Sequence, residues 1–210
     1  MEMPVDFPGT LQKILLGCGI LASLLKVGTD VLAGLTTKGY NFVLHSISNL
    51  SALGAPTRSF VLPLDLIYDL LMLAFSVAVW QLAGQSVPMR IAAVLIAANA
   101  LISGVVETFL PMRLGQAPGT LHVALMATAM FAFVGAIALG GPGSSGLLRY
   151  LSYGIILAFI ILTAVGLIFP ARNAAGRPVA TIGVQERTMV VAYLLWVIAL
   201  AVQQLLRQRT

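Results

Sequence analysis

Six long apolar stretches, separated by turns rich in glycine and proline, constrain this chain more than any other feature of its sequence. They lie at residues 11–33, 60–83, 90–110, 121–140, 147–169 and 187–207. Each approaches the roughly 20 apolar residues that an α-helix needs to cross a bilayer. Only 9% of the 210 residues are charged, against about 25% in soluble domains. The sequence therefore predicts an all-α bundle of six transmembrane helices, forming a single integral membrane domain over residues 1–210.

Six crossings place both termini at one end of the bundle, here called the terminal end; the opposite end is called the loop end. The terminal end holds the turns at 84–90 and 141–149, and the loop end holds the loops at 34–59, 111–120 and 170–186. Lys and Arg number five at the terminal end and six at the loop end, so the positive-inside rule does not decide orientation by count. The basic residues of the terminal end lie in very short turns and in the tail, which favours a cytoplasmic location for both termini.

The net charge of +5 arises from twelve Lys and Arg residues against seven acidic residues. In a membrane protein such an excess reports orientation. The basic residues form no patch interleaved with aromatic residues, which excludes nucleic acid as a partner. The single cysteine, Cys18, excludes an internal disulfide and a CxxC site.

Most of the acidic residues and both histidines are predicted to converge on the loop end. They are Asp30, Asp65, Asp69, Glu107, Glu186, His45 and His122. Ionisable groups near hydrocarbon are costly unless they are paired or hydrated. A cluster at one end therefore predicts a polar pocket there.

The loop at 34–59 is long, and much of it is apolar. A loop of this length in a compact protein is usually functional or packed. Because bare backbone cannot face lipid, we expect a short capping or re-entrant segment at about 42–55, packed on the bundle.

Asp65 and Asp69 are four residues apart and share one helix face, with Pro63 expected in the first turn of that helix. The pair could bind a metal or share a proton. Alternatively, both carboxylates sit hydrated at the headgroups, favoured by the helix dipole.

A polar stripe runs down the third predicted span, formed by Asn99, Ser103 and Glu107 at intervals of four residues. In lipid such a stripe turns inward toward neighbouring helices. Glu107 is the deepest carboxylate and the strongest candidate for pocket chemistry. On the first span, Lys26 and Asp30 are also four apart, and we expect them to pair.

His45 and His122, with Glu107, Asp65 or Asp69, could hold a divalent metal with an open coordination position. The best set on this interpretation is His45, His122 and Glu107. No HxxxH or HxxH pair supports it.

A nucleophilic hydrolase is the other catalytic hypothesis, with Ser46 or Ser48 as nucleophile and His122 and Asp65 completing a triad. The sequence has no G-x-S-x-G elbow. Serines in such a run also cap short helices or bond the backbone.

The run His45-Ser-Ile-Ser-Asn-Leu-Ser-Ala-Leu-Gly-Ala-Pro-Thr-Arg58 resembles the opening motif of the domain of unknown function 998 family of bacterial and archaeal membrane proteins. Further matches are Pro111 with Leu121-His122, and Gly183-Val-Gln-Glu-Arg187 leading to Tyr193 and Trp196. Arg113 departs from the family pattern, which has an acidic residue there, and Glu107 is the acidic residue that could substitute for it. A more distant similarity is to the FRAG/DRAM membrane proteins. The resemblance implies six helices, a prokaryotic cell membrane and a lipid-related setting, with no established activity.

These observations favour binding of membrane lipids, or a lipid-modifying hydrolase or transferase. A proton- or cation-coupled transporter is an alternative, and so is a non-enzymatic sensor or structural protein. The terminal-end halves of the helices carry few polar residues, which disfavours a path through the bundle.

Overall fold

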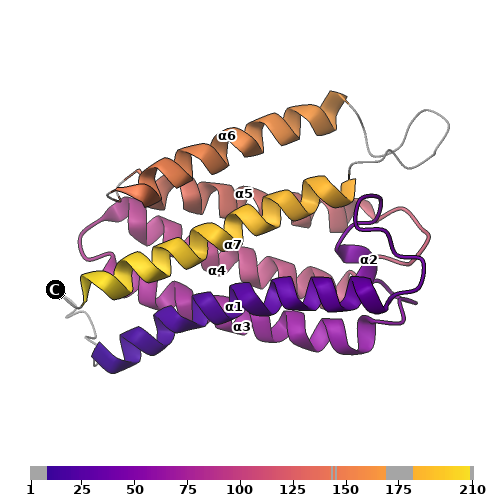
Figure 1. Cartoon of the computed structure of the whole chain (residues 1–210), viewed down its shortest axis with the longest axis horizontal. Coiled ribbons are helices and arrows are strands. Elements are labelled where there is room, and N and C mark those ends of the chain that lie inside the picture. The colour runs from indigo at the N-terminus through magenta and orange to yellow at the C-terminus, as the bar shows by residue number, and fades with distance from the viewer. Residues whose placement is uncertain (1–8, 143, 145, 169–181, 209–210) are drawn as a thin grey trace.

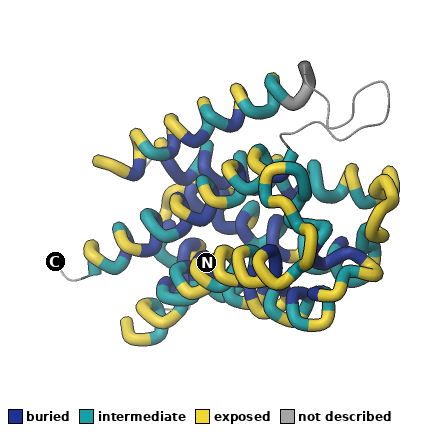
Figure 2. Tube along the Cα trace, turned by 45° about the vertical axis from the view of Figure 1, so that its right-hand side comes forward, coloured by how far each residue is buried: buried dark blue, intermediate teal, exposed yellow. Residues whose placement is uncertain are grey.

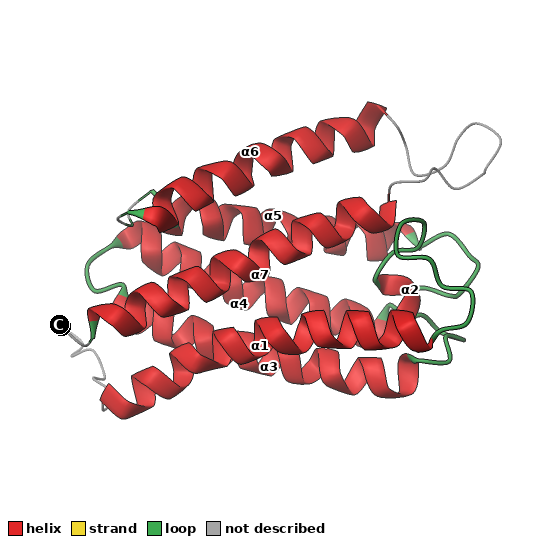
Figure 3. Ribbon diagram, in the orientation of Figure 1, coloured by secondary structure: helices red, strands yellow, loops and turns green. Residues whose placement is uncertain are grey.

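The computed structural model describes residues 9–142, 144, 146–168 and 182–208. The elements are α1 (Gly9–Thr36), α2 (Ser48–Ser51), α3 (Arg58–Leu82), α4 (Val87–Phe109), α5 (Thr120–Gly140), α6 (Leu147–Ile168) and α7 (Ile182–Arg207). All elements in these ranges are helices, and six of them are long and apolar enough to cross a membrane. The predicted all-α bundle with six spans is therefore confirmed (Figure 3).

Two helix starts differ from the prediction for reasons that depend on tertiary contacts. Helix α7 begins at Ile182, earlier than predicted, because Glu186 and Arg187 find partners inside the bundle and need not mark a boundary. Helix α3 begins at Arg58, so Pro63 lies inside the helix and the expected first-turn position was wrong. The predicted end of the fifth span at 169, and the first part of the 170–186 loop, fall outside the described residues.

The long helices lie roughly along one axis, with α1 against α3 and α7, and α4 between α3 and α5 (Figure 1). Helix α6 lies on the outside of α5 and α7. It is held by an edge-to-face contact between Phe133 and Phe159 at 5.4 Å and by a hydrogen bond from Gln185 to the carbonyl of Leu162. The start of α1 and the end of α7 lie at the same end of the bundle, as an even number of crossings requires.

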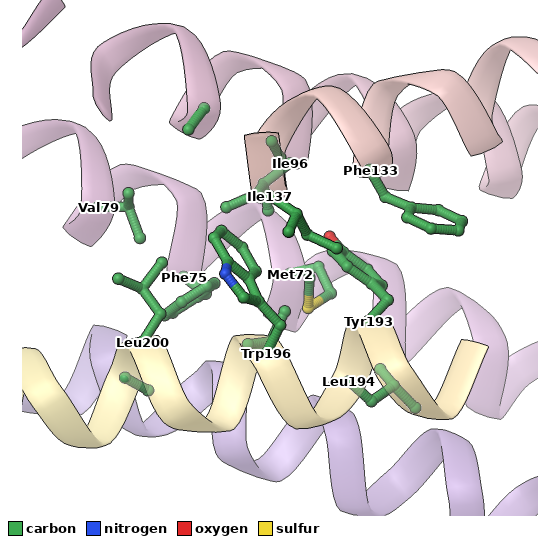
Figure 4. Close-up of a cluster of buried hydrophobic side chains, with 14 of the residues drawn as sticks. Met72, Phe75, Val79, Ile96, Phe133, Ile137, Tyr193, Leu194, Trp196 and Leu200 are labelled. Carbon is green, nitrogen blue, oxygen red and sulfur yellow. The ribbon is translucent and has the colours of Figure 1, made fainter. Parts of the chain in front are cut away.

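Apolar side chains fill the terminal-end half of the bundle and also cover its outer face. Trp196, Phe75 and Ile137 are fully buried at the centre (Figure 4). The indole of Trp196 donates to the Ser152 hydroxyl at 2.9 Å, so its one polar atom is satisfied. Large apolar residues such as Phe131 are exposed, which suits contact with lipid. Figure 2 shows exposed positions along the helices of the bundle.

The expected capping segment forms α2 and the loops around it, at the loop end (Figure 3). Leu53 joins this segment to the loop after α4: its N–H donates to Met112 at 2.7 Å, and its carbonyl accepts from Leu114 at 3.0 Å. Arg113, where the sequence departs from the family pattern, is the residue paired with Leu53. Two loops thus close the loop end through backbone hydrogen bonds.

Candidate functional site

A cavity of about 170 Å³ lies beneath α2, with walls from α1, α3, α4, α5 and α7. Its polar or charged lining residues, here called the charged wall, come from α1, α2, α3, α4 and α7: Lys26, Ser48, Tyr68, Asp69, Asn99, Ser103, Glu107, Glu186 and Tyr193. Its apolar lining residues, here called the apolar wall, come from α5 and α7, with Ile47 beside α2: Met126, Ala129, Met130, Phe133, Met189 and Val190. The predicted stripe on α4 does turn inward, because all three of its members line this cavity. A single chamber therefore offers both charged groups and an apolar surface.

Lys26 is the centre of an ion-pair cluster that joins three helices. Its ammonium lies 2.8 Å from an Asp65 carboxylate oxygen and 3.7 Å from a Glu107 oxygen. It also lies 5.4 Å from the centre of the Tyr68 ring, in cation–π range. One buried cation shared by two carboxylates compensates part of the desolvation cost of all three groups.

Asp69 shares its helix face with Asp65 but has a different environment. It is only 6% exposed, and neither carboxylate oxygen has a hydrogen-bond partner within the described part of the chain. Its Oδ2 packs against Gly104 of α4. A Cβ atom added to Gly104 would lie only 2.8 Å from this oxygen. Burial of both aspartates overturns the interpretation that they sit hydrated at the headgroups.

Glu186 ties α7 to the capping segment. One oxygen accepts the N–H of Ile47 at 2.8 Å, and the other accepts the Ser48 hydroxyl at 3.5 Å. A carboxylate at the start of a short helix satisfies N–H groups that have no partner within the helix. Glu186 therefore positions α2 over the cavity.

Arg187 forms a bidentate ion pair with Asp30: its Nε lies 2.9 Å from Oδ2, and its Nη2 lies 2.8 Å from Oδ1. The sequence-based expectation that Asp30 pairs with Lys26 was therefore wrong. Both side chains on α1 reach across to other helices, Asp30 to α7 and Lys26 to α3 and α4. The planar guanidinium matches a carboxylate in this manner, whereas an ammonium does not.

The same guanidinium holds the loop between α1 and α2. Arg187 donates to the carbonyls of Phe42 and His45 at 2.9 Å, and it lies over the Phe42 ring at 4.9 Å from its centre. It also donates to the Tyr40 hydroxyl, which in turn donates to the Ser46 carbonyl at 2.8 Å. Burial raises the pKa of the Tyr40 phenol, so it stays protonated in this chain of hydrogen bonds.

The two histidines lie away from the cavity lining. The ring Nδ1 of His45 accepts the N–H of Asn41 at 3.0 Å. The Nδ1 of His122 lies 2.8 Å from the carbonyl of Leu110, at the start of the loop that follows α4. Among the described residues, no group of three or more His, Cys, Asp and Glu is placed to hold a metal. The structure therefore does not bring His45, His122 and Glu107 together, and the predicted metal set does not fit.

The candidate nucleophiles also have partners other than histidine. The Ser46 hydroxyl donates to Asn49 at 3.2 Å, and that of Ser48 is directed at Glu186. Asp65, the expected third member of the triad, is bound by Lys26. The structure thus brings Ser48, Asp69 and Glu107 to one cavity and places Asp65 directly behind it.

Sequence reasoning missed several residues of the cavity. Lys26 was expected to pair with Asp30, and Tyr193 was noted only as part of a family match. Tyr193 lines the cavity with its hydroxyl unpartnered among the residues described, and its ring stacks on Phe133 at 4.9 Å. A lysine deep in an apolar span was the available signal, since such a charge needs a buried partner.

The family comparison agrees with the architecture. Residues 20–203 match the family described as Protein of unknown function (DUF998). Comparison with curated proteins and with solved structures gave no match. The matched range includes every residue that lines the cavity. The chain is an integral membrane protein that belongs to the DUF998 family.

Proposed function

We propose that this protein binds an amphiphilic molecule of the membrane, with its polar head on the charged wall of the cavity and its apolar part on the opposite wall. The observation that carries the proposal is that one cavity is lined both by charged side chains, mostly from α1, α3 and α4, and by apolar side chains from α5 and α7. Ligand pockets are typically apolar with a few placed polar groups, which is the composition found here.

The apolar wall is suited to variable hydrocarbon shapes. Met126, Met130 and Met189 line it from α5 and α7. Methionine is unbranched and polarizable, and adaptable binding surfaces use it for that reason. A volume of about 170 Å³ accommodates a head group and the first part of a chain, so a longer ligand extends beyond the chamber.

The layer beneath the cavity favours binding over transport through the bundle. About one turn beyond the cavity-lining Asp69, Asn99, Phe133 and Tyr193, the helices place Met72, Ile96, Ile137 and Trp196. All four of these are fully buried, and Figure 4 shows them packed together. A path to the terminal end would require this close-packed layer to separate.

The hydrogen bonds of the serines favour binding over nucleophilic catalysis. Ser46 donates to Asn49 and Ser48 donates to Glu186, and within the described residues neither hydroxyl is hydrogen-bonded to a histidine that could act as a base. A lipid-modifying reaction would need a different nucleophile.

The test compares two positions of α5 that are two residues apart. Ala129 lines the cavity and is buried, whereas Phe131 is 68% exposed on the outer face. Purified wild type, Ala129→Leu and Phe131→Leu are washed extensively in detergent, and retained amphiphiles are counted by native mass spectrometry. We expect near-stoichiometric retention in wild type and Phe131→Leu, and loss in Ala129→Leu. Equal retention in the two variants, or none in wild type, contradicts the proposal.

A further inference from the structure

We infer that the ligand carries a protonated amine, which binds the carboxylate of Asp69. This inference rests on the proposed function, because it names the head group of the molecule that occupies the cavity. It stands on three features of the chamber: its charge, the ion pairs and hydrogen bonds that its other ionic groups already form, and the absence of a partner for Asp69 among the described residues.

The charge of the chamber selects against an anionic head group. Asp69, Glu107 and Glu186 line it and Asp65 stands behind Lys26, so four acidic side chains surround one ammonium. A phosphate or carboxylate would enter a site already dominated by its own sign of charge. A cation reduces this repulsion.

The other ionic groups of the chamber already have partners. Lys26 serves Asp65 and Glu107, and Glu186 holds the N–H of Ile47. Arg187, which follows Glu186 on α7, is paired with Asp30. Asp69 is therefore the carboxylate of the chamber that is left for a ligand.

The position of Asp69 fits an ammonium group. It is more than nine-tenths buried, lines the cavity, and has two oxygens without a partner among the described residues. A buried carboxylate in this state is destabilising until a donor reaches it. Gly104 leaves the space on α4 that the carboxylate occupies, since a Cβ there would lie 2.8 Å from Oδ2.

The surrounding aromatic groups add to the preference for an ammonium. Tyr193 also lines the chamber, and its hydroxyl has no partner in the described ranges, so it is available to accept a second N–H. Tyr193 stacks on Phe133, and both rings face the same space as Asp69. Aromatic faces attract cations, and the effect is larger where water is excluded.

The experiment compares three probes of equal chain length: n-octylamine, 1-octanol and octanoate. Binding to wild type, Asp69→Asn and Ala129→Leu is measured by native mass spectrometry, with thermal unfolding as a check on folding. We expect octylamine to bind wild type most tightly and to lose roughly 30-fold in affinity in Asp69→Asn. Octanol should bind both proteins equally, which shows that the asparagine variant retains a folded cavity.

Two failures are distinguishable. If octanol binds as well as octylamine and Asp69→Asn changes neither, while Ala129→Leu weakens both, the amine is wrong and amphiphile binding stands. If Ala129→Leu changes nothing, the proposed function fails as well. Tightest binding of octanoate also overturns the inference.

A second arm identifies the source of the amine. Wild type and Asp69→Asn are reconstituted with phosphatidylethanolamine or phosphatidylglycerol, and retained lipid is counted. Retention of phosphatidylethanolamine that depends on Asp69 assigns the site to an aminolipid head group. Octylamine binding that depends on Asp69, without such retention, assigns it to a free amine. Preferential retention of phosphatidylglycerol by wild type contradicts a cationic ligand.

Discussion

Replacement of Lys26 by methionine tests the ion-pair cluster that forms one wall of the cavity. The substitution keeps an unbranched side chain of similar length but removes the charge that Asp65 and Glu107 share at 2.8 and 3.7 Å. Removal of one partner from a buried ion pair typically costs about 3–5 kcal/mol, because the remaining charge is buried without compensation. We expect a loss in that range for Lys26→Met, since two carboxylates are left.

The free energy of unfolding is measured by titration from mild detergent into SDS, with helix content followed by circular dichroism. Lys13→Met is the matched control on the same helix, because Lys13 is exposed, and its effect should stay within about 0.5 kcal/mol. The double variant Lys26→Met with Asp65→Asn should recover a large part of the loss, because the uncompensated charge is removed. Purely additive losses in the double variant would refute the reasoning.

Three further predictions concern close contacts of the loop end and of the cavity. Gly183→Ala should reduce the free energy of unfolding by about 1–3 kcal/mol, because the added Cβ would overlap the backbone carbonyls of loop 42–45. The control Gly154→Ala should leave the free energy of unfolding nearly unchanged, because there is open space at that position. Equal losses in the two variants would refute the proposed overlap. Gly104→Ala should weaken octylamine binding several-fold and octanol binding little, since it displaces the carboxylate of Asp69; an equal change for both probes argues against that mechanism. Arg187→Lys should speed amide hydrogen exchange in loop 42–47, because an ammonium cannot replace the guanidinium bonds, and unchanged exchange would contradict this role.

The helices were predictable from the sequence because crossing a membrane requires a long apolar run, whatever its neighbours. Their ends were less predictable where charged residues lay nearby. Glu186 and Arg187 looked like a boundary, yet both lie within α7 because α2 and Asp30 supply their partners. Local composition carries no information about such distant partners.

The convergence of acidic residues on the loop end was also predictable, because side chains at the same depth of a bundle must meet or face lipid. Both histidines also lie at the loop end, but neither lines the cavity. His45 and His122 lie in separate loop contacts, with Asn41 and Leu110, and a loop's path depends on backbone bonds that sequence spacing does not specify.

The sequence by itself determined that this chain is a six-helix membrane protein with charged groups gathered at one end, because hydrocarbon penalises unpaired charge and unbonded backbone at every position. Only the tertiary structure decided the pairing: Lys26 with Asp65 and Glu107, and Arg187 with Asp30. Long side chains choose partners across helices, and that choice depends on helix packing and rotation. The same packing left Asp69 at the cavity without a partner in the part of the chain that the structure describes, and this feature is what makes the proposed ligand testable.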